Sequence, residues 1–243
     1  MIGRWIFVRD RAMTGQGWLA LAALTLLALI ALLPLRLAFG WAAPVSVTAR
    51  NIEGSVWSGR IADLTAGPLP LGTVDAGLEP LPLLLGRAQF AVTRAGDTPF
   101  VARASGGAGV LRLSGVNGAV NLPDGLGGLP VTSVSFGDFA LRLEDGTCAE
   151  AKGSLGITLA SPGPMMPDPI TLSGKARCER GGLVVPMQGP GGMERLTLRI
   201  DSDATWKADL ILSGLPAEAT GPLLQGGFTA RPGGVGLRTS GRF

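Results

Sequence analysis

Apolar and polar side chains alternate along most of the chain after residue 40. The alternation is clearest over residues 136–144 (FGDFALRLE), 154–159 (SLGITL) and 196–201 (LTLRID). A period of two puts every second side chain on the same face of a β-strand, so one face can be buried while the other meets water. Long runs with helical spacing are absent from this region. The sequence therefore predicts a domain built mainly of strands.

Glycine and proline separate these strands. The 243 residues include 38 Gly and 18 Pro, and the stretches Pro-Asp-Gly at 123–125 and Gly-Pro-Gly-Gly at 189–192 have the composition of tight turns. Short connections favour antiparallel pairing, and glycine inside strands lets a sheet bend. Because 46% of the residues are apolar, the glycine content does not indicate disorder. We expect a mostly all-β protein with a curved antiparallel sheet.

An uncharged apolar run precedes this domain. Residues 17–35 (GWLALAALTLLALIALLPL) are about as long as a helix that crosses a bilayer core. Leu26 and Leu33 lie inside the run, and Trp18 and Trp41 flank it at a spacing that suits the two membrane interfaces. The run therefore predicts an N-terminal transmembrane helix that serves as a membrane anchor.

The charges around the run predict its orientation. Three Arg and one Asp precede it, and this excess of Arg keeps the N-terminal segment in the cytoplasm. We expect a cytoplasmic N-terminus (1–16), a transmembrane helix (17–39) and a periplasmic domain (40–243) in a single-pass inner-membrane protein. A cleaved signal peptide is the alternative, but its apolar region is usually only about 7–15 residues long.

Two cysteines lie in the part that is expected to be periplasmic, where thiols are oxidised. A disulfide between Cys148 and Cys178 would close a loop of about 30 residues and stabilise the domain by roughly 3–4 kcal/mol in the chain-entropy model. Two free, buried thiols are the alternative. A metal site is a weaker candidate, because two cysteines without histidine give too few ligands.

The main domain carries no net charge. Four of the 21 Lys and Arg residues and one of the 18 Asp and Glu residues lie before Trp41, which leaves 17 of each sign from there on. A protein that binds nucleic acid needs a cluster of cations, and this span has none. We therefore expect no nucleic-acid partner.

The residue types argue against an enzyme. The chain contains no His, which excludes His-dependent serine triads and removes the commonest metal ligand. Phosphate-loop and dinucleotide-binding motifs are missing too. Paired acids can hydrolyse glycosides, but Glu144 with Asp145 and Asp201 with Asp203 lie beside predicted turns or strand ends, where solvated carboxylates are normal. We expect no catalytic site, cofactor or metal.

One short segment does not fit the strand pattern. Residues 81–85 (LPLLL) predict a short apolar helix or turn. The segment could plug the core of the domain, or it could form an apolar patch that binds a partner or lipid. We favour the core role.

Three stretches of the chain carry a family resemblance. The first is GSVWSG at residues 54–59, soon after the apolar run. It has the pattern Gly-x-hydrophobic-Trp-x-Gly, in which Gly54, Trp57 and Gly59 are the defining residues.

The second stretch is leucine-rich and ends in glycine, and the third closes the chain. The second runs from Leu-Gly at 71–72 to Leu84 and Gly86, and the third is GGFTARPGGVGLR at residues 226–238. Residues 75–77 (DAG) depart from the family pattern, which often has a Trp before the leucine-rich part.

In this order, behind such an anchor, the stretches resemble the type II secretion system protein N family, also called general secretion pathway protein N. The resemblance implies a non-enzymatic inner-membrane component of the machinery that exports folded proteins from the periplasm. Its partners would be the lipid bilayer and other secretion-system subunits. It would bind those subunits through the edges of its sheet.

The alternative is an AsmA-like lipid-binding or lipid-transfer protein that holds phospholipid in an apolar groove of its curved sheet. The inner face of the sheet distinguishes the two hypotheses. A continuous apolar trough open to solvent would favour the lipid carrier, and a closed core would favour the scaffold.

Overall fold

The computed structural model describes residues 15–42, 47–107, 109–123, 125–126, 129–161, 168–215 and 217–242. The expected cytoplasmic segment, residues 1–16, therefore lies almost wholly outside the described residues. The description below covers the apolar run from Gly15 onward and most of the domain that follows it.

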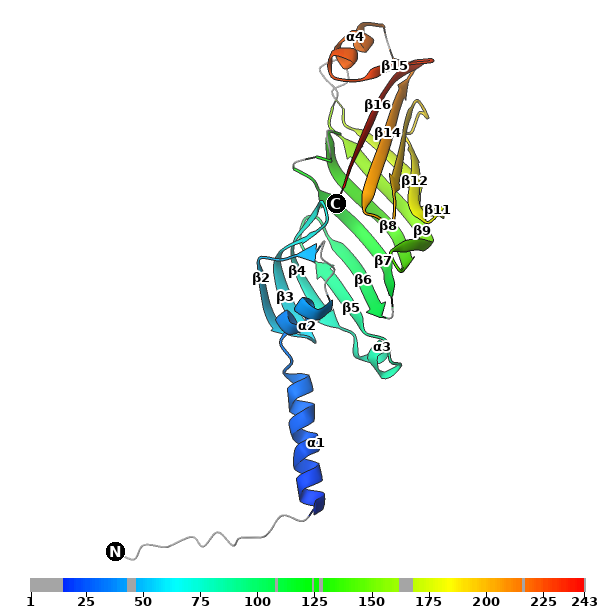
Figure 1. Cartoon of the computed structure of the whole chain (residues 1–243). Helices are drawn as coiled ribbons and strands as arrows, with labels where there is room; N and C mark the ends of the chain where they lie inside the picture. Colours follow the sequence, from blue (N-terminus) through cyan, green and yellow to red (C-terminus); the bar gives the residue numbers. More distant parts are fainter. Residues whose placement is uncertain are drawn as a thin grey trace, which may run out of the picture.

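Sixteen strands form one antiparallel sheet, in the spatial order β1-β3-β4-β5-β6-β7-β8-β9-β10-β12-β13-β14-β16-β15, with β2 beside β3 and β11 beside β12. Most strands pair with their neighbours in sequence, so the sheet is a long meander (Figure 1). The strands are β1 (Val47–Thr48), β2 (Asn51–Ser55), β3 (Ser58–Ala66), β4 (Leu69–Leu78), β5 (Gln89–Arg94), β6 (Phe100–Gly107), β7 (Val110–Asn121), β8 (Val131–Glu144), β9 (Thr147–Leu159), β10 (Ile170–Lys175), β11 (Arg177–Glu179), β12 (Gly182–Gln188), β13 (Glu194–Ile200), β14 (Thr205–Ser213), β15 (Thr229–Arg231) and β16 (Gly234–Arg242). The expected mostly all-β, antiparallel fold is confirmed.

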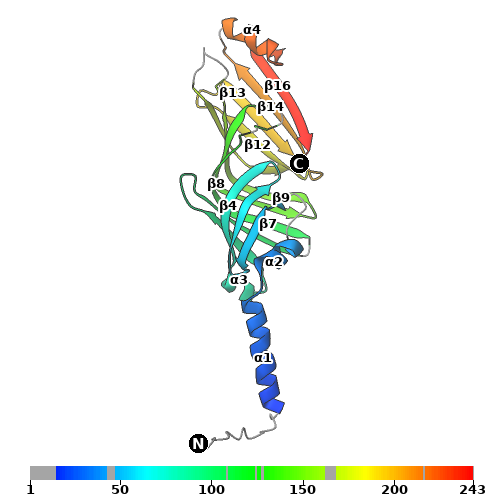
Figure 2. The same cartoon turned by 90° about the vertical axis from the view of Figure 1, so that its left-hand side faces the viewer.

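Among the described residues, four helices lie outside this sheet. They are α1 (Gly15–Ala31), α2 (Leu35–Ala42), α3 (Pro80–Leu84) and α4 (Ala217–Gln225). Figures 1 and 2 show α1 projecting from one end of the elongated domain, with α2 and α3 at that same end and α4 at the far end beside β15 and β16.

The apolar run does not form the single helix expected over residues 17–39. Helix α1 ends at Ala31, and α2 begins at Leu35 after a short break. Pro34 lies in the break, and a proline there has no N–H to continue the helical hydrogen bonds. Leu35 is only 2% exposed and belongs to the core of the β domain. No described helix is both long enough and apolar enough to cross a membrane.

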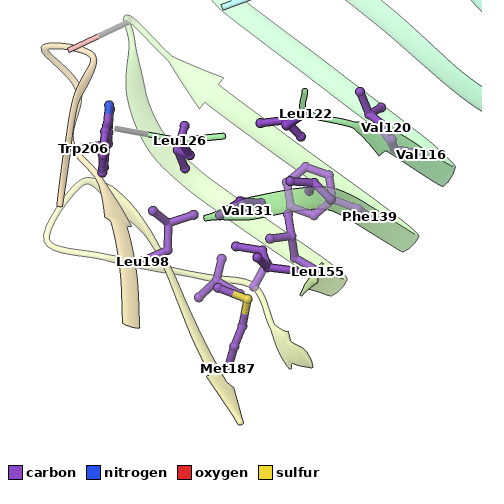
Figure 3. Close-up of a cluster of buried hydrophobic side chains, with 14 of the residues drawn as sticks. Val116, Val120, Leu122, Leu126, Val131, Phe139, Leu155, Met187, Leu198 and Trp206 are labelled. Carbon is purple, nitrogen blue, oxygen red and sulfur yellow. The ribbon is translucent and has the colours of Figure 1, made fainter. Parts of the chain in front are cut away.

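The inner face of the curved sheet is filled by the protein's own side chains. Apolar residues of β7, β8, β9, β12, β13 and β14 meet there in one buried cluster (Figure 3). The connection between β7 and β8 adds Leu122, Leu126 and Leu129 to this cluster, and each of them is at most 9% exposed. Leu126 and Leu129 also bond to each other through their backbones. This connection plugs the core, a role that we expected of residues 81–85.

Arg94 holds the N-terminal half of the sheet in a tight curl. Its guanidinium donates hydrogen bonds to the carbonyl of Leu71 on β4 at 2.7 Å and to that of Ala119 on β7 at 2.5 Å. Strands β5 and β6 separate β4 from β7 in the sheet, so only a strongly bent sheet brings the two carbonyls to one side chain. The Phe100 ring, 5.9 Å from the guanidinium carbon, covers the same group.

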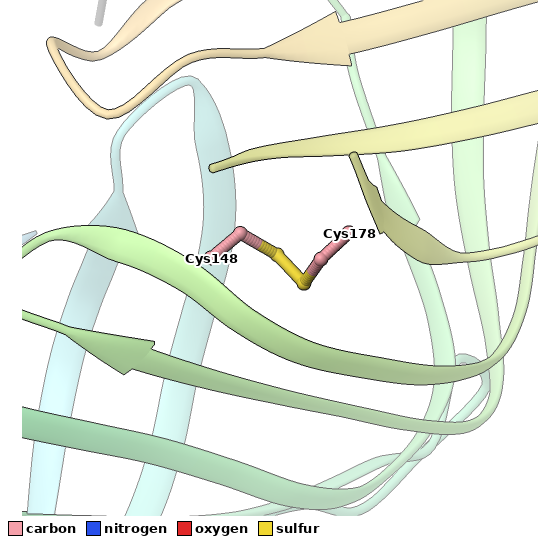
Figure 4. The surroundings of a disulfide bond; sticks show 2 residues. All are labelled: Cys148 and Cys178. Atoms are coloured by element: carbon pink, nitrogen blue, oxygen red, sulfur yellow. A yellow bond between two sulfur atoms is a disulfide. The ribbon is translucent and has the colours of Figure 1, made fainter. Parts of the chain in front are cut away.

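The expected disulfide between Cys148 and Cys178 is confirmed, with the two Cα atoms 5.6 Å apart (Figure 4). It lies where the ladder between β9 and β10 stops. Ala176 still donates a hydrogen bond to the Gly153 carbonyl, but β11 then pairs with β12 instead of β9. The disulfide therefore joins β9 to β11 where the described backbones form no strand ladder.

Replacing both cysteines by serine should lower the free energy of unfolding by roughly 3–4 kcal/mol, because the unfolded chain regains the entropy of a loop of about 30 residues. Urea unfolding of the full-length chain in detergent, followed by tryptophan fluorescence, measures this loss. Wild-type protein unfolded with a reductant should match the variant. An unchanged urea midpoint in both samples would contradict the stabilising role of the disulfide.

Candidate interaction surfaces

Helix α1 presents apolar side chains to the surroundings on all sides. It carries no charged residue, and its large side chains are exposed over the whole length of the helix. The exposed residues are Trp18, Leu19, Leu21, Leu24, Leu26, Leu27, Leu29 and Ile30. Leu33 follows the helix and is partly exposed, whereas Trp41 belongs to α2 and its side chain falls outside the described residues. A helix that is apolar all round needs an apolar environment.

The β2–β3 hairpin holds the end of this helix. The indole N–H of Trp57, in the turn of the hairpin, donates a hydrogen bond of 3.0 Å to the carbonyl of Ile30. The residue four positions after Ile30 is Pro34, which has no N–H to donate to this carbonyl, and the N–H of Leu33 reaches it only at 3.4 Å. The backbone N–H of Val56 donates to the Leu33 carbonyl at 2.8 Å, and Pro34 forms a β-bridge with Ser55. The hairpin thus fixes the direction in which α1 leaves the β domain.

Two glycines make room for this attachment. Gly54 and Gly59 face each other across the hairpin. A Cβ on Gly59 would lie 2.5 Å from a methyl carbon of Leu35, and one on Gly54 would lie 2.8 Å from the Gly59 Cα. Gly54 also has a φ of +89°, which favours glycine. The residues Gly54, Trp57 and Gly59, singled out in the sequence, therefore come together at the α1 junction.

Gly77 packs against the same hairpin. A Cβ on Gly77 would lie 2.4 Å from the Trp57 carbonyl oxygen. The neighbouring N–H, that of Leu78, donates a hydrogen bond of 2.8 Å to the Val56 carbonyl. Residues 75–77, where the chain departs from the family pattern, thus let the hairpin backbone approach β4 closely.

The leucine-rich segment projects into solvent. Helix α3 has no buried residue, and Leu81, Leu84 and Leu85 are 76%, 83% and 78% exposed. The expected core role of this segment is wrong. Together with Pro82, Arg87 and Gln89, these leucines line a shallow, mainly apolar surface hollow.

Gly86 gives the leucine loop, residues 81–87, its shape. It has a φ of +73° and follows Leu85, the last residue of the helical turn. Its N–H donates to the Leu83 carbonyl at 2.9 Å, and the N–H of Arg87 donates to the Pro82 carbonyl at 2.9 Å. This pair of bonds is a Schellman motif, which ends a helix at a left-handed glycine. The chain therefore turns back into β5 directly after Leu84 and Leu85.

The last strand leaves part of its outer edge open. Strand β15 covers only residues 234–236 of β16, and in the described chain no strand lies beside residues 237–242 on that side. Thr229 on β15 donates a hydrogen bond to the Gly236 carbonyl, so this carbonyl faces the outer edge. Because alternate residues of a strand present their backbone groups to the same edge, Arg238 and Ser240 also face outward.

One side chain of this edge forms an ion pair. Arg238 donates a 2.6 Å hydrogen bond to Asp209 of β14, and this bond raises the pKa of Arg238 above its usual range. The pair lies on the exposed face of the sheet, where salt bridges add little stability.

The first pair of acids lies at the β8–β9 hairpin. Glu144 forms an ion pair with Arg142, and Asp145 with Gly146 makes the tight turn, both with positive φ. Such a conformation is typical of Asp-Gly in a two-residue hairpin.

The second pair of acids shapes the connection between β13 and β14. Asp201 binds Arg199 at 2.6 Å and Lys207 at 3.7 Å. The backbone N–H of Thr205 donates to the Asp203 carboxylate at 3.0 Å and lowers the pKa of Asp203. Across the residues described, no three Cys, Asp or Glu side chains form a group that could hold a metal ion.

Replacing Trp57 by Phe should loosen α1 without unfolding the β domain. The variant keeps a smaller aromatic ring at this position but loses the hydrogen bond to Ile30, which is worth about 1 kcal/mol. Spin labels on Leu24→Cys in α1 and Thr73→Cys on β4 report the distance between helix and sheet, since both native cysteines are in the disulfide. We expect a broader distance distribution in W57F. Trp18→Phe is the matched control, and equal widths in all variants would contradict this role of Trp57.

The family model described as "Type II secretion system (T2SS), protein N" matches residues 46–238. The match includes the β2–β3 hairpin, the leucine loop and most of β16. No curated protein and no solved structure matches the chain. Since the family model covers well over half of the chain, the protein belongs to the type II secretion system protein N family, a family of secretion-machinery components of the cell envelope.

Proposed function

We propose that the protein is a non-enzymatic scaffold of the type II secretion machinery. In this proposal it is anchored in the inner membrane by its apolar N-terminal run, and it binds another subunit through the open edge of β16. Membership of the protein N family supports a role in secretion, and the open strand edge is the observation that carries the proposed mechanism.

An open edge of this kind can accept a strand from a partner. Outward-facing N–H and C=O groups on Arg238 and Ser240 would pair with the partner's backbone, which gives affinity, while side chains on both faces give selectivity. Most soluble proteins protect such edges because unpaired strands aggregate. Helix α4 and β15 cover only one end of β16, and this partial cover supports a specific use of the remainder.

The anchor as we propose it includes residues beyond α1. The N–H of Leu32 still donates to the Ala28 carbonyl at 2.9 Å, so the helical bonding extends past Ala31 before Pro34 ends it. Leu32 is also 76% exposed. The apolar segment would thus enter the inner membrane as a single pass, with the N-terminus in the cytoplasm and the β domain in the periplasm.

The filled inner face argues against a lipid carrier. A transfer protein needs an apolar trough that acyl chains can enter. In the described part of the sheet, the corresponding space holds Leu122, Leu126 and Leu129 from the β7–β8 connection. Two hollows lined by apolar residues lie outside the sheet, one at α3 and one between α1 and α2. We therefore favour the scaffold over phospholipid transport.

Replacing Ser240 by Pro should abolish strand addition while leaving the domain folded. Proline is tolerated at an edge whose N–H faces outward, but it removes a donor that the incoming strand needs. The measurement is the amount of other type II secretion subunits that co-purify from native membranes. We expect at least a tenfold loss with S240P. Ser240→Val, which keeps the N–H, is the matched control, and equal recovery with both variants would refute edge pairing.

Replacing Leu26 by Arg should weaken the membrane anchor. A charged side chain near the centre of an apolar helix costs about 2.5–3.5 kcal/mol on insertion. Wild-type protein should stay in the membrane pellet after alkaline extraction, and a large share of L26R should be released. Thr73→Arg on β4 is the control and should behave as wild type. Release of the wild type itself would disprove the anchor.

A further inference from the structure

We propose that the exposed leucine loop, residues 81–87, is a second membrane contact. In this inference, which rests on the anchoring proposed above, Leu81, Leu84 and Leu85 dip into the surface of the same membrane leaflet from which α1 emerges. The β domain would then rest against the bilayer at two points.

The position of the loop is the first argument. Figures 1 and 2 show α3 at the end of the β domain from which α1 projects, close to the level at which α1 ends and the β domain starts. Trp57 fixes the end of α1 to the β2–β3 hairpin, and Leu78 of β4, just before α3, bonds to the same hairpin. A rigid β domain therefore holds the loop at a set height relative to the anchor, near the membrane surface.

The shape of the loop is the second argument. Its three leucines are more than three-quarters exposed. Large apolar side chains that gather on a protein surface mark sites of contact with a membrane or another protein. The Schellman motif at Gly86 holds these leucines outward by turning the chain back sharply. The described part of the β domain leaves them uncovered, and a lipid surface adjoining the anchor would cover them.

The charges at this end of the domain suit an anionic membrane surface. Arg87 at the base of the loop and Arg36 on α2 are exposed, and neither forms an ion pair with another described residue. The nearest acid in sequence, Glu79, is neutralised by Arg103 at 3.1 Å and accepts a hydrogen bond from Gln89. Segments that lie in the membrane interface typically insert leucines into the lipid and keep cations just above them, at the level of the headgroups.

A membrane explains the features of the loop better than a protein partner does. A protein-binding patch could lie anywhere on the domain, whereas the leucines lie at the end that carries the anchor. Arg87 adjoins the leucines, and helical segments that bind at membrane surfaces combine these two residue types.

The test places one environment-sensitive dye at each of three positions in the full-length protein, reconstituted into vesicles of phosphatidylcholine and phosphatidylglycerol. The disulfide occupies both native cysteines, so Leu84→Cys, Leu26→Cys and Asp97→Cys can be labelled separately. Leu26 reports the anchor. Asp97 is exposed at the opposite end of β5 from α3 and serves as the control in water. Lipids that carry quenching groups on their acyl chains reveal which dyes touch the bilayer.

We expect lipid quenching of the dyes at Leu26 and Leu84, each at least threefold stronger than at Asp97. Quenching at Leu26 with a water-exposed dye at Leu84 would overturn the second contact and leave the anchor intact. A blue-shifted dye at Leu84 that lipid does not quench would mean that protein covers the loop, which also overturns the inference. A lack of quenching at Leu26 would disprove the proposed anchor and, with it, the contact that rests on it.

Discussion

A single sheet has to bury its apolar face without a second layer of structure. Most domains solve this problem by packing helices or another sheet on that face. Here the sheet bends on itself, and Arg94 ties β4 to β7 across the strands between them. The β7–β8 connection then fills the remaining space with leucines. The core, the shape of the domain and the positions of its ends all depend on this self-covering curvature.

The attachment of α1 depends on backbone contacts that only small residues permit. Gly59 leaves space for Leu35, and Gly77 leaves space for the Trp57 carbonyl. In such a place a glycine is required by the close approach of a neighbour and not by chain flexibility. The Gly-x-x-Trp-x-Gly pattern therefore describes the junction between α1 and the β domain, in which the indole N–H of Trp57 bonds to the Ile30 carbonyl at the end of the helix.

The sequence predicts the strands and the disulfide because period-two alternation and cysteine placement can be read directly from the chain. It predicts the family from three short stretches. Three features escaped prediction for a physical reason. Residues 81–85 and the β7–β8 connection are both leucine-containing loops, and only the bending of the sheet determines that Leu126 is buried and Leu84 exposed. The break after α1 was also missed, since it depends on the docking of Leu35 into the core as much as on Pro34.

The meander has a consequence for how the protein is made. Nearly every strand pairs with the one before it in the chain, so each can add to the growing sheet as it is synthesised. The exceptions are β2, β11 and β15, and β16 inserts between β14 and β15. The open edge of β16 consequently forms only after β16 has been added to the sheet, and a chain cut before residue 234 lacks this surface.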